Sequence, residues 1–169
     1  MLKSISITDY ILIDNFSVDL HPGLNVITGE TGAGKSILIS AIDNALGGKC
    51  GKDVIKTGAE KAVIELAVET KDKEVFDILA ENEIETGEEF IITREITPTT
   101  SKYRIDGIIV NQNVIKDLRS HLLDVHSQHQ SYTFLQKKYH IFQKDHNFHV
   151  NEFFPLLFLE LLYLNIHNP

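Results

Sequence analysis

The chain has 169 residues, of which 43% are hydrophobic and 24% charged, a composition that excludes global disorder and a collagen-like repeat. Sixteen basic and 24 acidic residues give a net charge of −8, so bulk charge does not indicate a domain that coats nucleic acid. The single cysteine, Cys50, excludes an internal disulfide and a zinc site built from cysteines.

The N-terminal part of the chain predicts strands followed by one helix. Apolar and polar residues alternate in residues 4–8 and 16–20, which is the pattern of half-buried strands, and the apolar residues of 24–28 predict a further short strand. A glycine-rich stretch comes next. Apolar residues then recur at helical spacing until Gly47 and Gly48, which we expect to end the helix.

The middle of the chain, from about residue 62 to 110, reads as β-rich. Strands are predicted over 64–69 and 90–96, with a short helix over 74–82 between them. Two further short strands flank Asp106-Gly107, a pair that supplies the positive φ angles of a tight type I′ turn and so predicts a hairpin.

After the hairpin, residues 113–121 predict a second amphipathic helix and residues 122–125 a short strand. A polar stretch over 126–130 follows. His121, His126 and His129 in this region raise the question of a metal site, but their spacings of five and three give no clean i, i+4 pair. A polar loop explains these histidines as well.

One motif carries chemistry: the stretch that follows the third strand matches the phosphate-binding pattern G-x-x-x-x-G-K-[ST]. Its glycines allow the sharp turn that aims backbone N–H groups at phosphate oxygens, and the helix that follows presents its positive end to the same anion. The lysine supplies a cation for the β- and γ-phosphates, and the serine a hydroxyl ligand for Mg²⁺. We therefore predict a nucleotide site made of Gly29, Glu30, Thr31, Gly32, Ala33, Gly34, Lys35 and Ser36.

The residues that hydrolysis requires are harder to find. An acid at the end of a second apolar strand should hold Mg²⁺, and the nearest candidate is Asp124. Only Leu122 and Leu123 precede it as apolar residues, so an ordinary strand-end or loop acid explains Asp124 equally well.

A family resemblance is carried by residues 2–7, 12–16, 23–37, 54–62, 103–107 and 122–130. Its most specific parts are Gly-Glu-Thr-Gly-Ala-Gly-Lys-Ser and the downstream His-Ser-Gln-His. Together these segments resemble the RecN family, the SMC-like bacterial ATPases of DNA double-strand-break repair, over about residues 1 to 140.

The resemblance implies an α/β fold, the N-terminal lobe of an ABC-type P-loop ATPase head with a β-rich subdomain. Residues 29–36 would be its Walker A, and Gln128 its Q-loop glutamine, with Gln130 as the nearby alternative. Ser36 and Gln128 would hold Mg²⁺ beside bound ATP. It further implies a C-terminal head lobe or a second head as partner, DNA as the target of the full-length protein, and a cytoplasmic, nucleoid-associated location.

The chain also departs from the family pattern. The family's Leu-Ser-Gly-Gly-type signature, Walker B acid and switch histidine are not found in it, so we expect ATP binding with very poor hydrolysis by this chain alone. Two alternatives stay open: a stand-alone P-loop kinase or GTPase, and a decayed fragment that binds nucleotide weakly or not at all.

The composition changes near residue 141. We expect two parts, an ATP-binding lobe over 1–140 and an atypical apolar tail over 141–169. The abrupt change to Phe, Leu, Asn and His suggests that residues 142–169 arise from a frameshift or premature end, and a genuine amphipathic helix is the alternative. The apolar run over 153–164 is too short to span a bilayer, so no membrane partner is expected.

Overall fold

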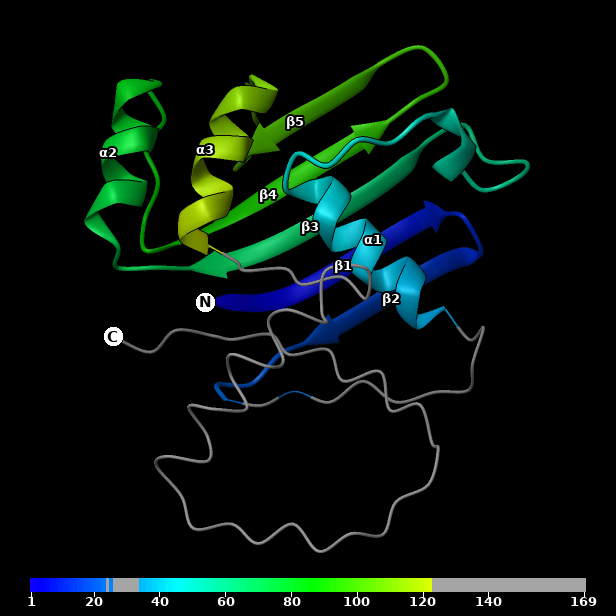
Figure 1. The fold of residues 1–169 in the computed structure, drawn as a ribbon, viewed down its shortest axis with the longest axis horizontal. Coiled ribbons are helices and arrows are strands. Elements are labelled where there is room, and N and C mark those ends of the chain that lie inside the picture. Colours follow the sequence, from blue (N-terminus) through cyan, green and yellow to red (C-terminus); the bar gives the residue numbers. More distant parts are fainter. Residues whose placement is uncertain (24, 26–33, 123–169) are drawn as a thin grey trace, which may run out of the picture.

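The computed structural model describes residues 1–23, 25 and 34–122, and Figure 1 shows the arrangement of their elements. The strand predicted over 24–28, most of the phosphate-binding motif and everything predicted beyond residue 122 therefore lie outside the described residues.

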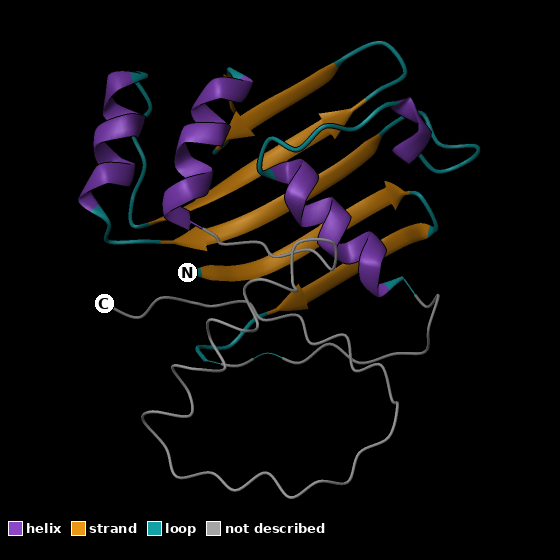
Figure 2. Cartoon of the chain, in the orientation of Figure 1, coloured by secondary structure: helices purple, strands orange, loops and turns teal. Residues whose placement is uncertain are grey.

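The described residues form one six-stranded sheet in which each neighbouring pair of strands is antiparallel. Figure 2 shows this sheet as one continuous layer, with β3 at its centre between β1 and β4. In spatial order the strands are β2 (Ile13–Asp19), β1 (Leu2–Tyr10), β3 (Ala62–Glu69), β4 (Glu89–Ile96), β5 (Ser101–Ile105) and β6 (Ile108–Val110).

The sequence pattern fixes which face of this sheet is buried. Successive side chains of a strand point to opposite faces, so the alternation in β3 puts Ile64 and Leu66 inside and leaves Glu65 exposed. The register places Ile7 opposite Ile64 and Ile92 opposite Leu66, so neighbouring strands present their apolar side chains to the same face. The opposite face carries charged residues.

Three α-helices and one 3₁₀ helix complete the described structure. They are α1 (Lys35–Ala45), η1 (Lys52–Val54), α2 (Lys73–Glu81) and α3 (Gln112–Leu122). Helix α1 packs on β1, β3 and β4, α3 packs on β5, and α2 lies beside α3 (Figure 1). The apolar side chains of α1, among them Leu38, Ala41 and Ile42, are buried in the same core as the inward side chains of the sheet.

Apart from Leu122, the predicted helices and strands within the described residues are confirmed. The predicted hairpin has positive φ at both Asp106 (46°) and Gly107 (83°), as a type I′ turn requires. The β-rich region is larger than expected, because β1 and β2 join β3–β6 in the same sheet. Leu122, predicted to begin a strand, is instead the last residue of α3.

Within the described ranges, no helix combines the length and the apolar character that crossing a bilayer requires.

Candidate functional site

The N-terminus of α1 is the described part of the predicted phosphate-binding motif. The helix begins at Lys35, and Gly34 before it is left-handed, with φ 97° and ψ 1°. A glycine reaches this conformation without the steric cost that a Cβ brings. Among the residues that the structure describes, no neighbouring atom lies within 4 Å of where a Cβ of Gly34 would stand, so the backbone angle explains the glycine better than crowding does.

This end of α1 is favourable for an anion. The N–H groups of the first turn of a helix have no hydrogen-bond partner inside the helix. In α1 the internal hydrogen bonds begin with Leu38, whose N–H donates to Gly34 O at 3.0 Å. Gly34 has no side chain with which to cap these groups, and the first turn holds no acidic residue. The partial positive charge of the helix end is therefore not neutralised by α1 itself.

Two residues next to the motif also have defined positions. Ser36 is exposed, and its carbonyl accepts a hydrogen bond of 2.9 Å from Ser40 Oγ one turn later. Asn25 fixes the turn before the motif, because its side chain accepts from His21 N–H at 3.0 Å and donates to His21 O at 2.7 Å. The exposed position of Ser36 is compatible with a hydroxyl ligand for Mg²⁺.

The remaining predicted site residues are not placed by the structure. Gly29, Glu30, Thr31, Gly32 and Ala33 lie outside the described residues, as does the side chain of Lys35. The same holds for the predicted Q-loop residue Gln128, its alternative Gln130, and Asp124, His126 and His129.

The C-terminus of α1 is held by a buried arginine from the sheet. Arg94 of β4 is only 4% exposed, and its Nη1 donates to Asn44 O at 2.6 Å and to Gly48 O at 2.7 Å. The last carbonyls of a helix have no N–H partner inside it, so the guanidinium supplies the missing donors. Its positive charge also interacts favourably with the negative end of the helix dipole. The guanidinium also lies 4.8 Å from the ring centre of Tyr103 and donates through Nε to Ser101 Oγ.

A second contact joins α1 to β1. Asn44 Nδ2 donates to the Tyr10 hydroxyl over 2.6 Å, and the Tyr10 side chain is fully buried. Burial of the phenol raises the pKa of Tyr10 to about 12, although the hydrogen bond from Asn44 acts in the opposite direction. Burial likewise raises the pKa of Tyr103, whose ring lies under Arg94.

Helix α3 also contacts the end of α1. Gln112 Nε2 donates to Gly47 O at 2.9 Å, and Arg119 forms an ion pair with Asp43 at 2.5 Å. Position 48 requires a glycine because the backbone of Asp43 lies close to it: a Cβ at this position would lie 2.7 Å from Asp43 O. The predicted helix stop at Gly47 and Gly48 is thus also the point where β4 and α3 hold α1.

Arg94 is a residue that the predicted site does not include, although its position in the sequence carries a signal. It stands in phase with Phe90, Ile92 and Ile96, the inward positions of β4. A charged residue at a core position of an alternating strand indicates a buried, paired side chain. Its partners on Asn44 and Gly48 are not recognisable from the sequence, because they are carbonyl groups on another element.

The predicted histidine group is only partly placed. His121 lies in the last turn of α3, not in a polar loop, and its neighbours are Asp72 and Glu74 at the start of α2. Sequence reasoning identified neither carboxylate, since nothing local links them to residue 121.

Known families and proteins match most of this chain. The AAA domain family matches residues 4–160, a range that runs past the predicted boundary at residue 140. DNA repair protein RecN of Synechocystis is 42% identical over 137 residues, which cover 78% of this chain and 23% of that protein. DNA repair protein RecN of Bacillus subtilis is 33% identical over 144 residues, which cover 83% of this chain and 25% of that protein.

Solved structures of ATPase heads share the fold. One, from work on ATP-driven dimerization and DNA stimulated activation of SMC ATPases, matches with a TM-score of 0.61 at 20% identity, covering 86% of this chain and 92% of that one. The recombination mediator protein RecF bound to ATPrS matches with a TM-score of 0.55 at 19% identity, covering 68% of this chain and 29% of that one. These matches confirm the resemblance to RecN and the fold class, the N-terminal lobe of a P-loop ATPase head. The chain spans about a quarter of the length of the RecN relatives it matches.

Proposed function

Since the chain belongs to the AAA domain family, we propose that it binds ATP with Mg²⁺ through residues 29–36, the Walker A stretch at the N-terminus of α1. The observation that carries this proposal is the start of α1: a left-handed Gly34, no acidic residue in the first turn, and an exposed Ser36. N–H groups that have no partner within the helix, at an end whose first turn holds no acid, suit a triphosphate.

Within this site each residue type has a separate task. The backbone of residues 29–34 surrounds the phosphates, Lys35 pairs with them as a cation, and the hydroxyl of Ser36 ligates Mg²⁺. Gln128 is the second proposed Mg²⁺ ligand, with Gln130 as its alternative. When bound, Mg²⁺ neutralises part of the phosphate charge.

The firm attachment of α1 supports the same function. Arg94, Tyr10 and Gln112 fix the far end of the helix to β4, β1 and α3. A helix attached at one end can present its other end to a ligand without being ordered on binding, which lowers the entropic cost of binding.

We further propose that hydrolysis needs residues from a second polypeptide segment, either a C-terminal head lobe or a second head. The proposal rests on the resemblance to RecN and on the signature and Walker B acid not found in this chain. The complete protein would act in DNA repair in the cytoplasm. The lobe over 1–140 would carry nucleotide binding, and residues 141–169 would not be needed for it.

A calorimetric titration of the purified chain with ATP and Mg²⁺ tests the site. We expect Lys35→Ala to weaken binding by about 2 kcal/mol or more, because bonds to charged groups are worth about 1.5–3 kcal/mol. Lys102→Ala is the matched control, since Lys102 is an exposed cation on β5. Equal affinities for the two variants would refute the proposed site.

Two further measurements test the rest of the proposal. Turnover by the chain alone should stay well below about 1 s⁻¹, the lower end of the usual enzyme range. Faster turnover that Lys35→Ala abolishes would instead indicate a self-sufficient P-loop enzyme. Deletion of residues 142–169 should leave ATP affinity unchanged, and unfolding of the shortened chain would show that the tail belongs to the lobe.

A further inference from the structure

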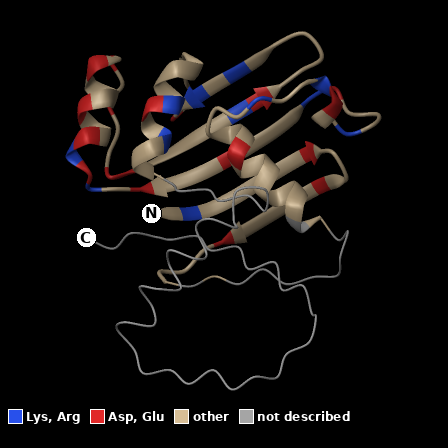
Figure 3. Cartoon of the chain, viewed as in Figure 1, with Lys and Arg blue, Asp and Glu red and all other residues tan. Residues whose placement is uncertain are grey.

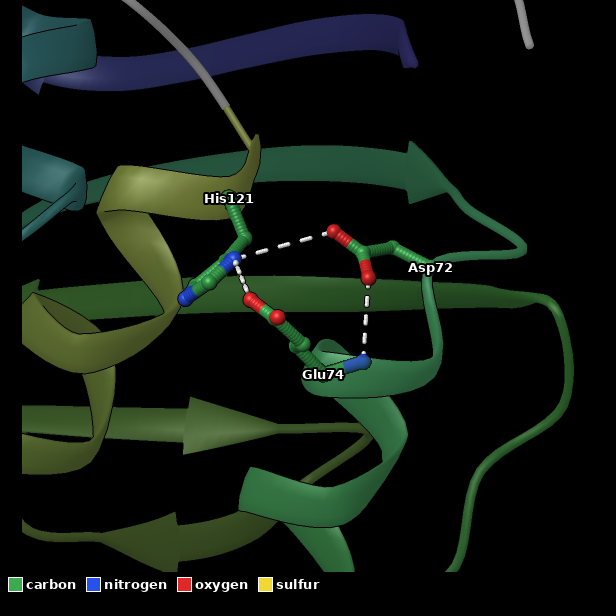
Figure 4. A group of neighbouring side chains, drawn as sticks. All are labelled: Asp72, Glu74 and His121. Atoms are coloured by element: carbon green, nitrogen blue, oxygen red, sulfur yellow. Dashed lines mark hydrogen bonds and ion pairs between the residues drawn. The ribbon is translucent and has the colours of Figure 1, made fainter.

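Three potential metal ligands meet where α2 begins and α3 ends. His121 Nδ1 lies 3.1 Å from Glu74 Oε2 and 3.6 Å from Asp72 Oδ2 (Figure 4). One ligand atom from each of the three side chains lies within 4.8 Å of the other two. This group, the Asp72–Glu74–His121 cluster, lies outside the nucleotide motif and has no task in the proposed function.

Local structure fixes the two carboxylates. Asp72 is the N-cap of α2, and its Oδ1 accepts the Glu74 N–H at 2.9 Å. The other oxygen, Oδ2, is left facing His121. Asp72 N–H in turn donates to Thr70 Oγ1 at 3.1 Å, which holds the turn before the helix. The cap therefore orients one oxygen of Asp72 toward the cluster and occupies the other.

The imidazole comes from a different element. His121 stands in the last turn of α3, and α3 packs beside α2. Its side chain is 26% exposed, against 40% for Asp72 and 73% for Glu74, so the cluster is open to solvent on the side of Glu74. An ion can reach it without any movement of the two helices.

The cluster has excess negative charge. Over residues 1–23, 25 and 34–122, no lysine or arginine forms an ion pair with Asp72 or Glu74, and Lys71 next to them pairs with Glu88 at 3.7 Å. Beyond Lys73 and Glu74, the charged residues of α2 are Asp77 and Glu81, and Figure 3 shows the helix as mostly acidic, with a basic band at its start. The carboxylates of Asp72 and Glu74 repel one another, and a cation bound between them would relieve this repulsion.

We propose that the Asp72–Glu74–His121 cluster binds a divalent transition-metal ion of the zinc class. Two ligands bound to one Zn²⁺ at about 2.1 Å each lie about 3–3.5 Å apart, close to the separations from His121 to the two carboxylates. The nitrogen donor favours zinc and its neighbours in the first transition row over Mg²⁺, which prefers oxygen ligands. Three protein ligands leave a further coordination position for water.

The metal would link α2 to α3. The two helices are joined in sequence only through β4, β5 and β6, so an ion shared between them closes a long loop of chain. A metal that binds only the folded arrangement stabilises it by an amount that grows with the logarithm of the free metal concentration above Kd.

Zinc titration of the metal-free full chain tests the proposal, with three variants that remove one ligand each: Asp72→Asn, Glu74→Gln and His121→Asn. Asparagine caps helices about as well as aspartate, so Asp72→Asn removes a charged ligand while keeping α2 intact. Asp77→Asn is the matched control, an exposed acid of α2 outside the cluster. The chain holds eight histidines, so the binding site must also be located. Paramagnetic broadening of amide NMR signals by Co²⁺ does this.

We expect each ligand variant to lower the affinity of the tightest zinc site at least about ten-fold. Loss of a residue that only hydrogen-bonds to a metal ligand already lowers metal affinity by about ten-fold or more, and loss of a ligand itself should cost at least as much. Asp77→Asn should bind as the wild type does, and Co²⁺ should broaden the signals of residues 72, 74 and 121. Wild-type affinity in all three ligand variants would overturn the proposal. Broadening confined to other histidines, or an unchanged spectrum, would also overturn it and would leave the cluster as a polar contact between α2 and α3.

Discussion

The two ends of α1 differ sharply in how they are held. At the C-terminal end, Arg94, Gln112 and Arg119 bind the last carbonyls or side chains of the helix from β4 and α3. At the N-terminal end, Gly34 offers no capping side chain and the first turn has no acid. The residues that stabilise the helix and the residues proposed to bind ligand are thus at opposite ends of one element.

The N-terminus of α2, unlike that of α1, has a capping side chain and an acid in its first turn. Asp72 caps α2 by accepting the Glu74 N–H, and Glu74 adds an acid to the first turn. Both features lower the free energy of a helix N-terminus. Because α1 lacks both, its own sequence leaves its N–H groups available, as binding an external anion requires.

The largest expected effect is at the anchored end of α1. Arg94→Met should lower the free energy of unfolding by about 3 kcal/mol or more. Gly48 O loses its donor, and the buried Asn44 O loses its shortest hydrogen bond and keeps only the longer ones from Gly47 N–H at 3.2 Å and the Tyr103 hydroxyl at 3.5 Å. Urea unfolding followed by circular dichroism measures this. Arg104→Met is the control: Arg104 is paired at 3.9 Å with Glu95, a contact worth about 1 kcal/mol or less. Similar costs for the two variants would contradict the anchoring role of Arg94.

The second expected effect is at the open end. Lys35→Ala should reduce ATP affinity by about 2 kcal/mol, roughly thirty-fold, and change the unfolding free energy by less than about 0.5 kcal/mol. Calorimetry and urea unfolding of the same protein preparation measure both quantities. A variant that loses stability and binding together would show that the two ends of α1 are not separable.

The third prediction uses alkaline pH to weaken the anchored end. The folded state keeps Tyr10 protonated up to a pKa of about 12, against 10.0 for an ordinary tyrosine, so Tyr10 contributes stability that is full below pH 10.0 and is lost as pH rises toward 12. At pH 11 the loss should be about 1 kcal/mol.

Tyr10→Phe should remove this part of the pH dependence, so its unfolding free energy should fall less than that of the wild type between pH 9 and pH 11. Some dependence should persist, because burial also raises the pKa of Tyr103. Equal slopes in the two proteins would refute the role of Tyr10.

The smallest expected effect is at the capped helix. Asp72→Ala should lower the unfolding free energy by about 1 kcal/mol through loss of the cap, and Asp72→Asn by only a few tenths. Thermal unfolding in the presence of a chelator separates this cap effect from the proposed metal site. A large loss with asparagine under those conditions would show that the carboxylate charge itself stabilises α2.

Local elements were predictable because their signals are local. The alternation in β3 and β4, the helical spacing after residue 36 and the Asp106-Gly107 turn each depend on residues a few positions apart. The same holds for the motif over 29–36, whose eight residues indicate a phosphate site without any knowledge of the fold.

The single sheet, by contrast, was not predictable in full. Pairing of β1 with β3 joins residues about 60 positions apart, as in Ile5 with Leu66, and no local feature of either strand identifies the strand it pairs with. The sequence therefore suggested a β-rich region limited to about 62–110, whereas the register adds β1 and β2 to it.

The sequence by itself thus determined most of the secondary structure of the described residues, the likeness to P-loop ATPases and the residues proposed to bind phosphate. Only the tertiary structure decided that Arg94 holds the carbonyls of Asn44 and Gly48, and that His121 meets Asp72 and Glu74. The physical reason is that side-chain type and periodicity are encoded residue by residue. Which helix end meets which strand depends instead on sheet register and on how each helix packs across the sheet.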